Sequence, residues 1–226
     1  MNKLRKLRSS MAVNIIGAIV ILLVAFAIIV SEIGFASFTK TFKREYSEAT
    51  YHMANTATAL INGDHLDEYL AGEETEEYEH SKKQLEYFCE KMGVSMIYLI
   101  KVDTSDYGRF VSIFNPVENS VDDTSYTEWE LGHERDTTND EYRQKYKAIY
   151  EQRAPYETVF RMKTTDGQHP HITTMVPVKD SGGEVVGILC VQRPARIIDD
   201  AIRPVKKIAL ATILLALLSS IIAALF

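Results

Sequence analysis

The chain has 226 residues, of which 46% are hydrophobic and 25% are charged, so it suits one folded domain with additional apolar segments. Its 31 acidic and 25 basic residues give a formal net charge of −6. This acidic balance argues against nucleic-acid binding and against attraction of the folded segment to anionic lipid through its overall charge.

Two apolar runs are long enough to cross a membrane. Neither the run 11–30 nor the run 208–226 contains a charged residue. Because an α-helix rises about 1.5 Å per residue, about 20 residues cross a hydrocarbon core of about 30 Å. We therefore predict transmembrane helices at 11–30 and 208–226.

Basic residues orient the first span. Four of them precede it without an acidic residue among them: Lys3, Arg5, Lys6 and Arg8. The positive-inside rule then predicts a cytoplasmic N-terminus at 1–10 and an extracytoplasmic segment at 31–207. No small-x-small cleavage site follows the first run, which favours an uncleaved anchor over a signal peptide. The predicted location is the inner or plasma membrane, with two spans.

Three basic residues oppose this orientation. Arg203, Lys206 and Lys207 immediately precede the second run, on its predicted outer side. A basic segment after that run would support the topology more directly. Large domains nevertheless translocate largely regardless of the charges beside them, so we keep the predicted orientation.

Apolar residues at spacings of three and four predict that the first span continues as a long helix, which ends at Asn62-Gly63. The predicted stripe contains Phe35, Phe38, Phe42, Tyr46, Ala49, Met53, Thr56 and Leu60. Such a stripe packs on a sheet or on a partner helix, and its near-heptad spacing indicates a homodimer.

The segment 64–79 is rich in acidic residues and is followed by a predicted helix at 81–91. Its carboxylates, with His65 and His80, match neither the spacing of a calcium loop nor that of a zinc site, so a solvated acidic face is favoured. His169-Pro170-His171 is interpreted as a turn rather than a metal site. We predict no metal and no cofactor.

Five further runs have the composition of β-strands: 94–101, 109–114, 157–163, 171–178 and 184–192. A helix is predicted at 139–152, within the long insertion that separates the second strand from the third. Asp180-Ser181-Gly182-Gly183 indicates a hairpin between the last two strands. The fold class is therefore α+β, with an antiparallel sheet, a long N-terminal helix and two flanking transmembrane helices.

The two cysteines, Cys89 and Cys190, lie in apolar surroundings. A disulfide between them is possible in an oxidising compartment, but two separate buried thiols are favoured.

Two stretches resemble the Cache family of extracytoplasmic sensors. They are Gly93-Val94-Ser95-Met96-Ile97-Tyr98-Leu99-Ile100 and the segment 175–189, MVPVKDSGGEVVGIL, just before the second apolar run. The resemblance covers about 35–200 and implies a single module with a PAS-like five-stranded antiparallel sheet. It also implies a small-molecule ligand beneath the insertion, a homodimer, and a cytoplasmic output domain or signalling partner, which is absent from this chain.

The resemblance directs attention to aromatic residues near the insertion. Amino-acid receptors of the double-module type carry an Arg-x-Trp-Tyr pattern there, whereas this chain has Tyr126-Thr127-Glu128-Trp129-Glu130 and lacks the arginine. Amino-acid specificity therefore does not transfer. The predicted ligand-binding residues are Tyr98, Phe114, Tyr126, Trp129, Tyr156 and Arg161. Each of the aromatic residues has the alternative role of an ordinary core residue.

No nucleophile elbow, zinc-protease helix, phosphate loop or Cys-x-x-Cys pair occurs, so we predict no catalytic residues. Two hypotheses remain besides a weaker one of an extracytoplasmic hydrolase. The leading hypothesis is ligand sensing with transmembrane signal transduction. The alternative is a ligand-free, membrane-anchored module that binds a separate signalling protein.

Overall fold

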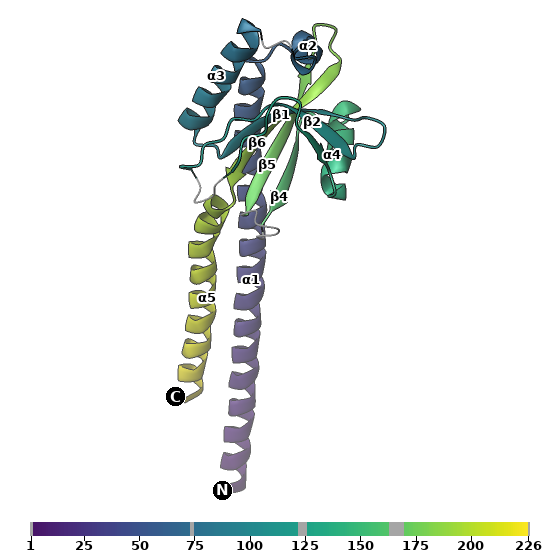
Figure 1. The fold of residues 1–226 in the computed structure, drawn as a ribbon. Coiled ribbons are helices and arrows are strands. Elements are labelled where there is room, and N and C mark those ends of the chain that lie inside the picture. Colours follow the sequence, from purple (N-terminus) through teal and green to yellow (C-terminus); the bar gives the residue numbers. More distant parts are fainter. Residues whose placement is uncertain (1, 73–74, 122–125, 163–169, 226) are drawn as a thin grey trace. The chain divides into compact units, whose positions relative to one another are not determined.

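The computed structural model describes residues 2–72, 75–121, 126–162 and 170–225 (Figure 1). The chain forms two compact units. One is helical and contains residues 1–44 and 197–226, and the other extends from Glu45 to Arg196. The long helix α1 (Asn2–Thr58) contributes to both units.

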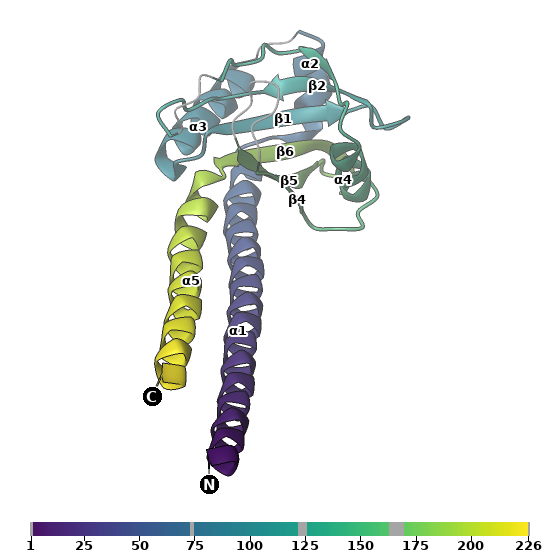
Figure 2. The same ribbon diagram turned by 90° about the horizontal axis from the view of Figure 1, so that it is seen from below.

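The helical unit consists of most of α1 and of α5 (Arg196–Leu225), which Figure 2 shows as two long helices. Their large apolar side chains are mostly exposed. Leu22 is 71% exposed and Leu215 is 66% exposed, values that an aqueous environment disfavours for a whole helix. Among the described residues, one helix segment, Asn14–Thr58, is long and apolar enough to cross a membrane. The second span, at 208–226, stays a prediction.

The other unit is built on an antiparallel sheet with the strand order β3-β2-β1-β6-β5-β4. The strands are β1 (Met96–Val102), β2 (Arg109–Phe114), β3 (Glu134–Asp136), β4 (Glu157–Arg161), β5 (His171–Lys179) and β6 (Val185–Pro194). The described residues therefore form six strands, and the prediction of five was wrong. β3 was missed because its three residues, Glu134, Arg135 and Asp136, are all polar and exposed, so it lacks the apolar alternation of a strand.

The hairpin between β5 and β6 agrees with its prediction. The Asp180 N–H donates to the Glu184 carbonyl oxygen at 3.0 Å, and the Asp180 side chain accepts from the Glu184 N–H at 2.9 Å. Gly183 has a φ of 85°, which glycine adopts readily and other residues rarely. The turn is thus closed by its own backbone and by one aspartate.

Helices cover one face of the sheet: the last turns of α1, α2 (Leu66–Leu70) and α3 (Glu76–Met92). A short 3-10 helix, Gly63–His65, links α1 to α2. α3 begins earlier than predicted because Thr75 caps its N-terminus, accepting from the Tyr78 N–H at 3.1 Å. The core on this face, which we call the helix-covered face, contains Ala54, Ala57, Leu66, Tyr69, Tyr78, Leu85, Cys89, Val94, Ile97, Leu99, Ile113, Phe114, Val176, Val178, Leu189 and Val191.

The buried stripe of α1 differs from the predicted one. Ala49 and Thr56 are exposed, whereas Thr50, Ala54 and Ala57 are fully buried. Both stripes have helical spacing and both include Tyr46, so periodicity alone does not distinguish them. Thr50 is tolerated inside because its hydroxyl donates to the Tyr46 carbonyl oxygen at 2.8 Å.

The opposite face, which we call the insertion-covered face, is covered by α4 (Asp140–Tyr150) and by the irregular segment that precedes β3. Asn139 caps α4, accepting from the Glu141 N–H at 2.9 Å. The apolar core there contains Met96, Tyr98, Ile100, Val102, Phe110, Tyr142, Tyr146, Ile149, Val159, Met175, Ile188 and Cys190.

The two cysteines are free and buried on opposite faces of the sheet. Burial raises the pKa of the Cys89 thiol to about 12 and raises that of Cys190 as well.

Because the thiolate is the reactive form, we expect neither residue to react with iodoacetamide at pH 8 in the folded protein. Mass spectrometry before and after denaturation checks this. Rapid labelling of either thiol without unfolding would contradict the burial.

A histidine–glutamate pair joins the 3-10 helix to α3. His65 Nδ1 lies 2.6 Å from Glu77 Oε2, and Asn62 Nδ2 donates to the other Glu77 oxygen at 2.8 Å. The hydrogen bond to the Glu77 carboxylate, followed by the charges of Glu77, Glu68 and Asp64, raises the pKa of His65. The bonds from Asn62 and His65 lower the pKa of Glu77.

These opposite shifts define a pH window. The His65 contribution to stability is complete below its ordinary pKa of 6.5 and is lost as the pH rises through the folded pKa. The Glu77 contribution is complete above its ordinary pKa of 4.5 and is lost as the pH falls through the folded pKa.

We expect an NMR titration to give His65 a lower pKa in Glu77→Gln than in the unmodified chain. Equal pKa values in the two proteins would contradict the pairing.

Candidate ligand-binding site

Two asparagines order the first part of the insertion between β2 and β4. Asn115 directly follows β2, and its side-chain oxygen accepts from the Trp129 N–H at 2.7 Å. Asn119 accepts from the Tyr126 N–H at 2.7 Å and donates to the Tyr126 carbonyl oxygen at 3.3 Å. These bonds place the two aromatic side chains over the insertion-covered face, where both pack against its core.

Trp129 lies in an aromatic cluster on this face. Its ring centroid is 5.5 Å from that of Tyr98 in an edge-on arrangement, and 5.7 Å from that of Phe110. The Arg135 guanidinium lies 5.1 Å from the centre of the indole. Aromatic rings attract one another in edge-on and tilted arrangements of this kind, and the Arg135 cation attracts the face of the indole. The cluster forms an apolar wall.

Polar groups lie beside this wall on the same face. The Tyr142 hydroxyl of α4 donates to Thr173 Oγ1 of β5 at 3.2 Å. Thr173 is paired with Gln192 of β6, and Gln192 in turn with Met96 of β1. Arg161 follows two residues after the buried Val159 on β4, so strand alternation places it on this face as well, and its charge acts on Tyr142.

Two buried side-chain amides in this layer each have a donor that finds no acceptor among the described residues. Asn115 and Gln192 are each only 5% exposed, and among the described residues Asn115 Nδ2 and Gln192 Nε2 find no hydrogen-bond partner. A buried donor without an acceptor costs about 1–3 kcal/mol. Such groups are rare in folded proteins, and a bound molecule or an ordered water usually satisfies them.

The phenol groups of this layer are protonated at neutral pH. Burial raises the pKa of Tyr142 to about 12, against the opposing effects of the bond to Thr173 and of the Arg161 charge. Burial also raises the pKa of Tyr98 well above its ordinary value. The layer thus offers neutral hydroxyl and amide groups together with the guanidinium groups of Arg135 and Arg161.

The structure brings four of the six predicted residues to one face: Tyr98, Tyr126, Trp129 and Arg161. Phe114 and Tyr156 lie on the other. Phe114 stacks on Tyr78 of α3 with 4.7 Å between ring centroids, and Tyr156 stacks on Tyr51 of α1 at 4.5 Å. These two residues therefore lie on the opposite face of the sheet from the other four.

A β-bulge explains the placement of Phe114. The pairing of β1 with β2 shifts between Leu99 and Ile100, so that Leu99 faces Phe114 while Ile100 faces Ser112. Ile113 is the extra residue, and beyond it the alternation of sides is reversed. The sequence of β2 has regular apolar character and gives no signal for this shift.

Sequence reasoning missed Asn115 and Gln192. Asn115 looked like the end of a strand, because a proline follows it. Gln192 is the one uncharged polar side chain in the run Ile188–Gln192, whose other members are buried and apolar. A lone amide in a buried strand was a usable signal, since it requires a hydrogen-bond partner.

Hollows also occur elsewhere on this unit. One of about 380 Å³ lies between the turn after α1 and α3, lined by Leu60, Tyr87 and Phe88 among others. Another of about 580 Å³ lies against α4 and is lined mainly by charged side chains, including Lys145, Arg153 and Glu157. Neither includes the unsatisfied donors.

No protein-family model matches the chain, and no curated protein matches it either. Among solved structures, it is similar to the ligand-binding domain of the Campylobacter jejuni chemoreceptor Tlp3 in complex with 4-methylisoleucine, with 14% identity and a TM-score of 0.46. That match covers 79% of this chain and 62% of the other, so the chain spans less than two thirds of its neighbour.

Two other solved structures have lower scores. The inducer-binding domain of the transcription factor PobR from Acinetobacter has 11% identity and a TM-score of 0.35, with coverage of 57% of this chain and 92% of that one. The A. Aeolicus nlh2 GAF domain has 13% identity and a TM-score of 0.35, with coverage of 73% and 92%. The solved structures to which the chain is similar thus include sensory ligand-binding domains, although at TM-scores below 0.5 they do not locate a site in it.

Proposed function

We propose that this chain senses a small molecule on the extracytoplasmic side of a membrane and transmits the signal through its helices. One observation carries the proposal: Asn115 Nδ2 and Gln192 Nε2 are buried donors without acceptors among the described residues, on the face that holds Trp129. A ligand that supplies acceptors would recover their hydrogen bonds.

The chemistry of the layer favours a ligand with hydrogen-bond acceptors, such as a carboxylate or an amino-acid-like molecule. Asn115, Gln192 and Arg161 are donors, and Trp129 with Tyr98 offers aromatic area for an apolar portion. An arginine binds a carboxylate through two parallel hydrogen bonds, which are stronger than neutral ones. The ligand would lie between the sheet and the insertion.

A route for the signal follows from the order of the elements. Gln192 lies on β6, and α5 begins at Arg196 directly after that strand. A ligand that binds two arrangements of the sheet and insertion unequally would shift their populations and move the start of α5. In a homodimer, such a movement would reach a cytoplasmic output domain or a separate signalling partner.

A thermal-shift screen of the full chain in detergent tests the proposal, with amino acids, carboxylates, amines, purines and sugars as the panel. A ligand at a hundred times its Kd stabilises the fold by about 2.7 kcal/mol, which is readily detected. We expect at least one class to raise the Tm. No shift across the panel, with the protein folded, would support the alternative of a ligand-free interaction module.

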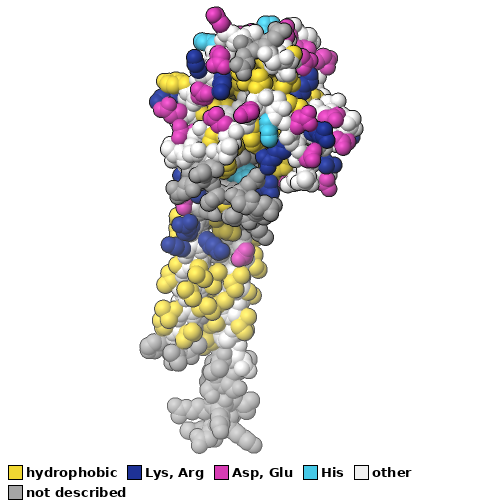
Figure 3. Space-filling view, in the orientation of Figure 1, with side chains coloured by type: hydrophobic (Ala, Val, Ile, Leu, Met, Phe, Trp, Pro, Cys, Tyr) yellow, Lys and Arg dark blue, Asp and Glu magenta, His cyan; other side chains and the backbone are white. Residues whose placement is uncertain are grey.

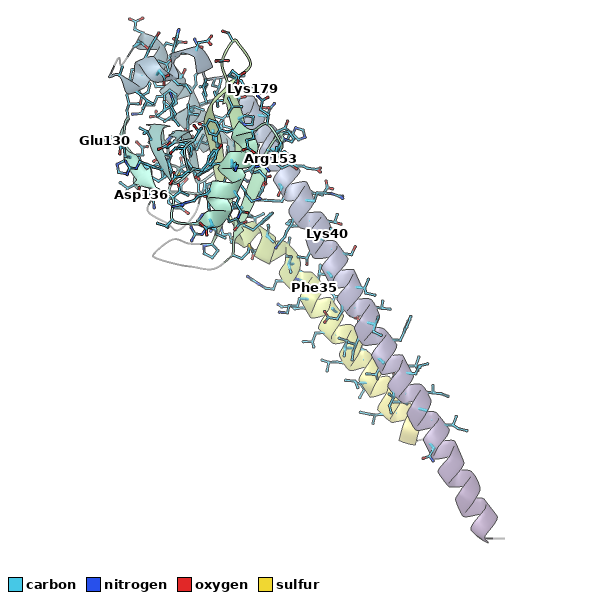
Figure 4. The ribbon with its side chains drawn as sticks, turned by 90° about the vertical axis from the view of Figure 1, so that its right-hand side faces the viewer. Phe35, Lys40, Glu130, Asp136, Arg153 and Lys179 are labelled. Atoms are coloured by element: carbon cyan, nitrogen blue, oxygen red, sulfur yellow. The ribbon has the colours of Figure 1, made fainter. Side chains whose placement is uncertain are left out.

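For an acidic ligand, Arg161→Gln should weaken binding by about 10- to 100-fold, because a charge-assisted hydrogen bond contributes about 1.5–3 kcal/mol. The matched control is Arg153→Gln, at an exposed arginine labelled in Figure 4 that pairs with Glu151 at 2.7 Å. That control should leave the Kd unchanged. Isothermal titration of the three proteins measures the difference, and equal affinities would exclude Arg161 from the site.

A further inference from the structure

We propose that two basic clusters on the long helices α1 and α5, each on the outer side of an apolar run, form a basic belt that binds the phosphate groups of anionic phospholipids. The inference rests on the membrane embedding assumed in the proposed function. The belt has two clusters with the same spacing: Lys40, Lys43 and Arg44 on α1, and Arg203, Lys206 and Lys207 on α5. In each, the second and third residues follow the first by three and four positions, so each cluster occupies one helix face.

The structure places both clusters in the helical unit, on helices α1 and α5. Lys40, Arg203, Lys206 and Lys207 are exposed. Arg203 makes an ion pair with Asp200 at 3.3 Å. Figure 3 shows Lys and Arg side chains gathered next to the apolar part of the helices, and Figure 4 shows Lys40 beyond Phe35 on α1.

The sequence positions fit a membrane surface. The cluster on α5 ends at Lys207, and the apolar run begins at Ile208. The cluster on α1 follows the apolar run 11–30 after a short stretch that contains Phe35 and Phe38. Because the two clusters lie at the same ends of two antiparallel spans, both would face the same leaflet.

Charge separates the belt from the sheet unit. Residues 45–196 contain 15 basic and 28 acidic residues, a net charge of −13. The flanking stretches 31–44 and 197–207 contain six basic and three acidic residues, a net charge of +3. The outer segment is acidic overall, but its two membrane-flanking stretches are locally positive. We place these stretches at the level of the lipid phosphates. Anionic lipids attract cations near the surface, and the attraction weakens with salt.

This inference accounts for the basic residues that oppose the predicted orientation. Lysine and arginine are depleted on the outer side of short membrane-flanking segments, so the exposed Lys40, Lys206 and Lys207 are explained by an anionic partner there. A carboxylate-rich domain close to an anionic surface would be repelled. Cations at the junction compensate for that repulsion and hold anionic headgroups beside the helices.

The test uses the full chain in nanodiscs of equal parts phosphatidylglycerol and phosphatidylcholine. Native mass spectrometry gives the ratio of the two lipids that stay bound. We expect the unmodified chain to retain phosphatidylglycerol in about two- to fivefold excess at low salt. In the quadruple variant Lys40→Gln, Arg203→Gln, Lys206→Gln and Lys207→Gln, the ratio should fall at least twofold.

Two controls make the outcome specific. The quadruple variant Lys82→Gln, Lys83→Gln, Lys91→Gln and Lys147→Gln removes the same charge from the sheet unit and should leave the lipid ratio unchanged. Circular dichroism confirms that each variant is folded. An unchanged ratio in the belt variant, an equal fall in the control variant, or failure of the chain to enter nanodiscs would overturn the proposal. A chain that binds no ligand in the thermal-shift screen would not overturn the proposal, because that screen tests sensing and not lipid binding.

Discussion

Gln192→Met is expected to make the unliganded protein more stable while abolishing its response to ligand. Methionine has a similar length and no donor, so the substitution removes the unsatisfied Nε2 from a position that is 5% exposed. Removing such a penalty should raise the free energy of unfolding by about 1–2 kcal/mol. The same change removes a proposed ligand contact, so the ligand-dependent rise in Tm should disappear. Chemical denaturation of the full chain, followed through Trp129 fluorescence, measures the first effect.

The matched control is Gln144→Met, at an exposed glutamine of α4. Surface substitutions of this kind usually change stability by less than about 0.5 kcal/mol, and ligand binding should be retained. If Gln192→Met destabilised the protein by 1 kcal/mol or more, the amide would have to be satisfied in the native state, and the argument for a ligand in that layer would fail.

Gly63→Ala is expected to destabilise the sheet unit by about 3 kcal/mol, at the upper end of the usual cost of overpacking. A Cβ at position 63 would overlap the Lys179 carbonyl oxygen and lie 2.7 Å from the Lys179 carbonyl carbon. Both are backbone atoms at the end of β5, so they move only if the hairpin moves. Lys179 is labelled in Figure 4. Denaturant unfolding of the full chain gives the change in free energy.

Gly72→Ala is the control for this clash. It introduces a side chain at a positive φ, where glycine is preferred, but into open space. Gly72 has a φ of 92°, and no atom lies within 4 Å of an added Cβ, so its cost should be about 1 kcal/mol. If the clash at position 63 is real, Gly63→Ala lowers the free energy of unfolding by more than Gly72→Ala does. Equal losses in the two variants would show that the approach of the 3-10 helix to β5 is not tight.

The strands and hairpin were predictable because their signals are local. Alternating β-branched residues identified β1, β2, β5 and β6, and Asp180-Ser181-Gly182-Gly183 specified the turn. β3 was not predictable, since it exists only through its pairing with β2, in which Arg109 is opposite Asp136. Its ion pairs are between exposed side chains and leave no apolar pattern.

The site was predictable only in part. Trp129 and Tyr98 were identified as aromatic residues near the insertion, and the structure places their rings 5.5 Å apart. Phe114 was assigned to the same site by its place on a strand, but a bulge at Ile113 turns it to the other face. Bulges depend on pairing between strands, which one strand's composition does not encode. Gln192 was overlooked because it was treated as the polar end of a strand.

The choice of stripe on α1 shows the limit of periodicity. Residues 46, 49, 53 and 56, like residues 46, 50, 54 and 57, follow one another at helical spacings of three and four. The first set has the larger apolar side chain in Met53. The second set is buried because Thr50, Ala54 and Ala57 are small enough for close approach to the sheet. Thr50 also accepts from Arg193 at 3.2 Å, a contact 143 positions away in the chain.

Trp129 is the only tryptophan in the chain, so its fluorescence reports directly on the proposed site. The most direct test of ligand sensing is a titration of the full chain with the ligand panel, followed through tryptophan emission. The account predicts a saturable change in emission for at least one acceptor-bearing ligand, absent from Gln192→Met and retained in Gln144→Met. Emission that no ligand changes in the folded protein, or a change that survives in Gln192→Met, would contradict it.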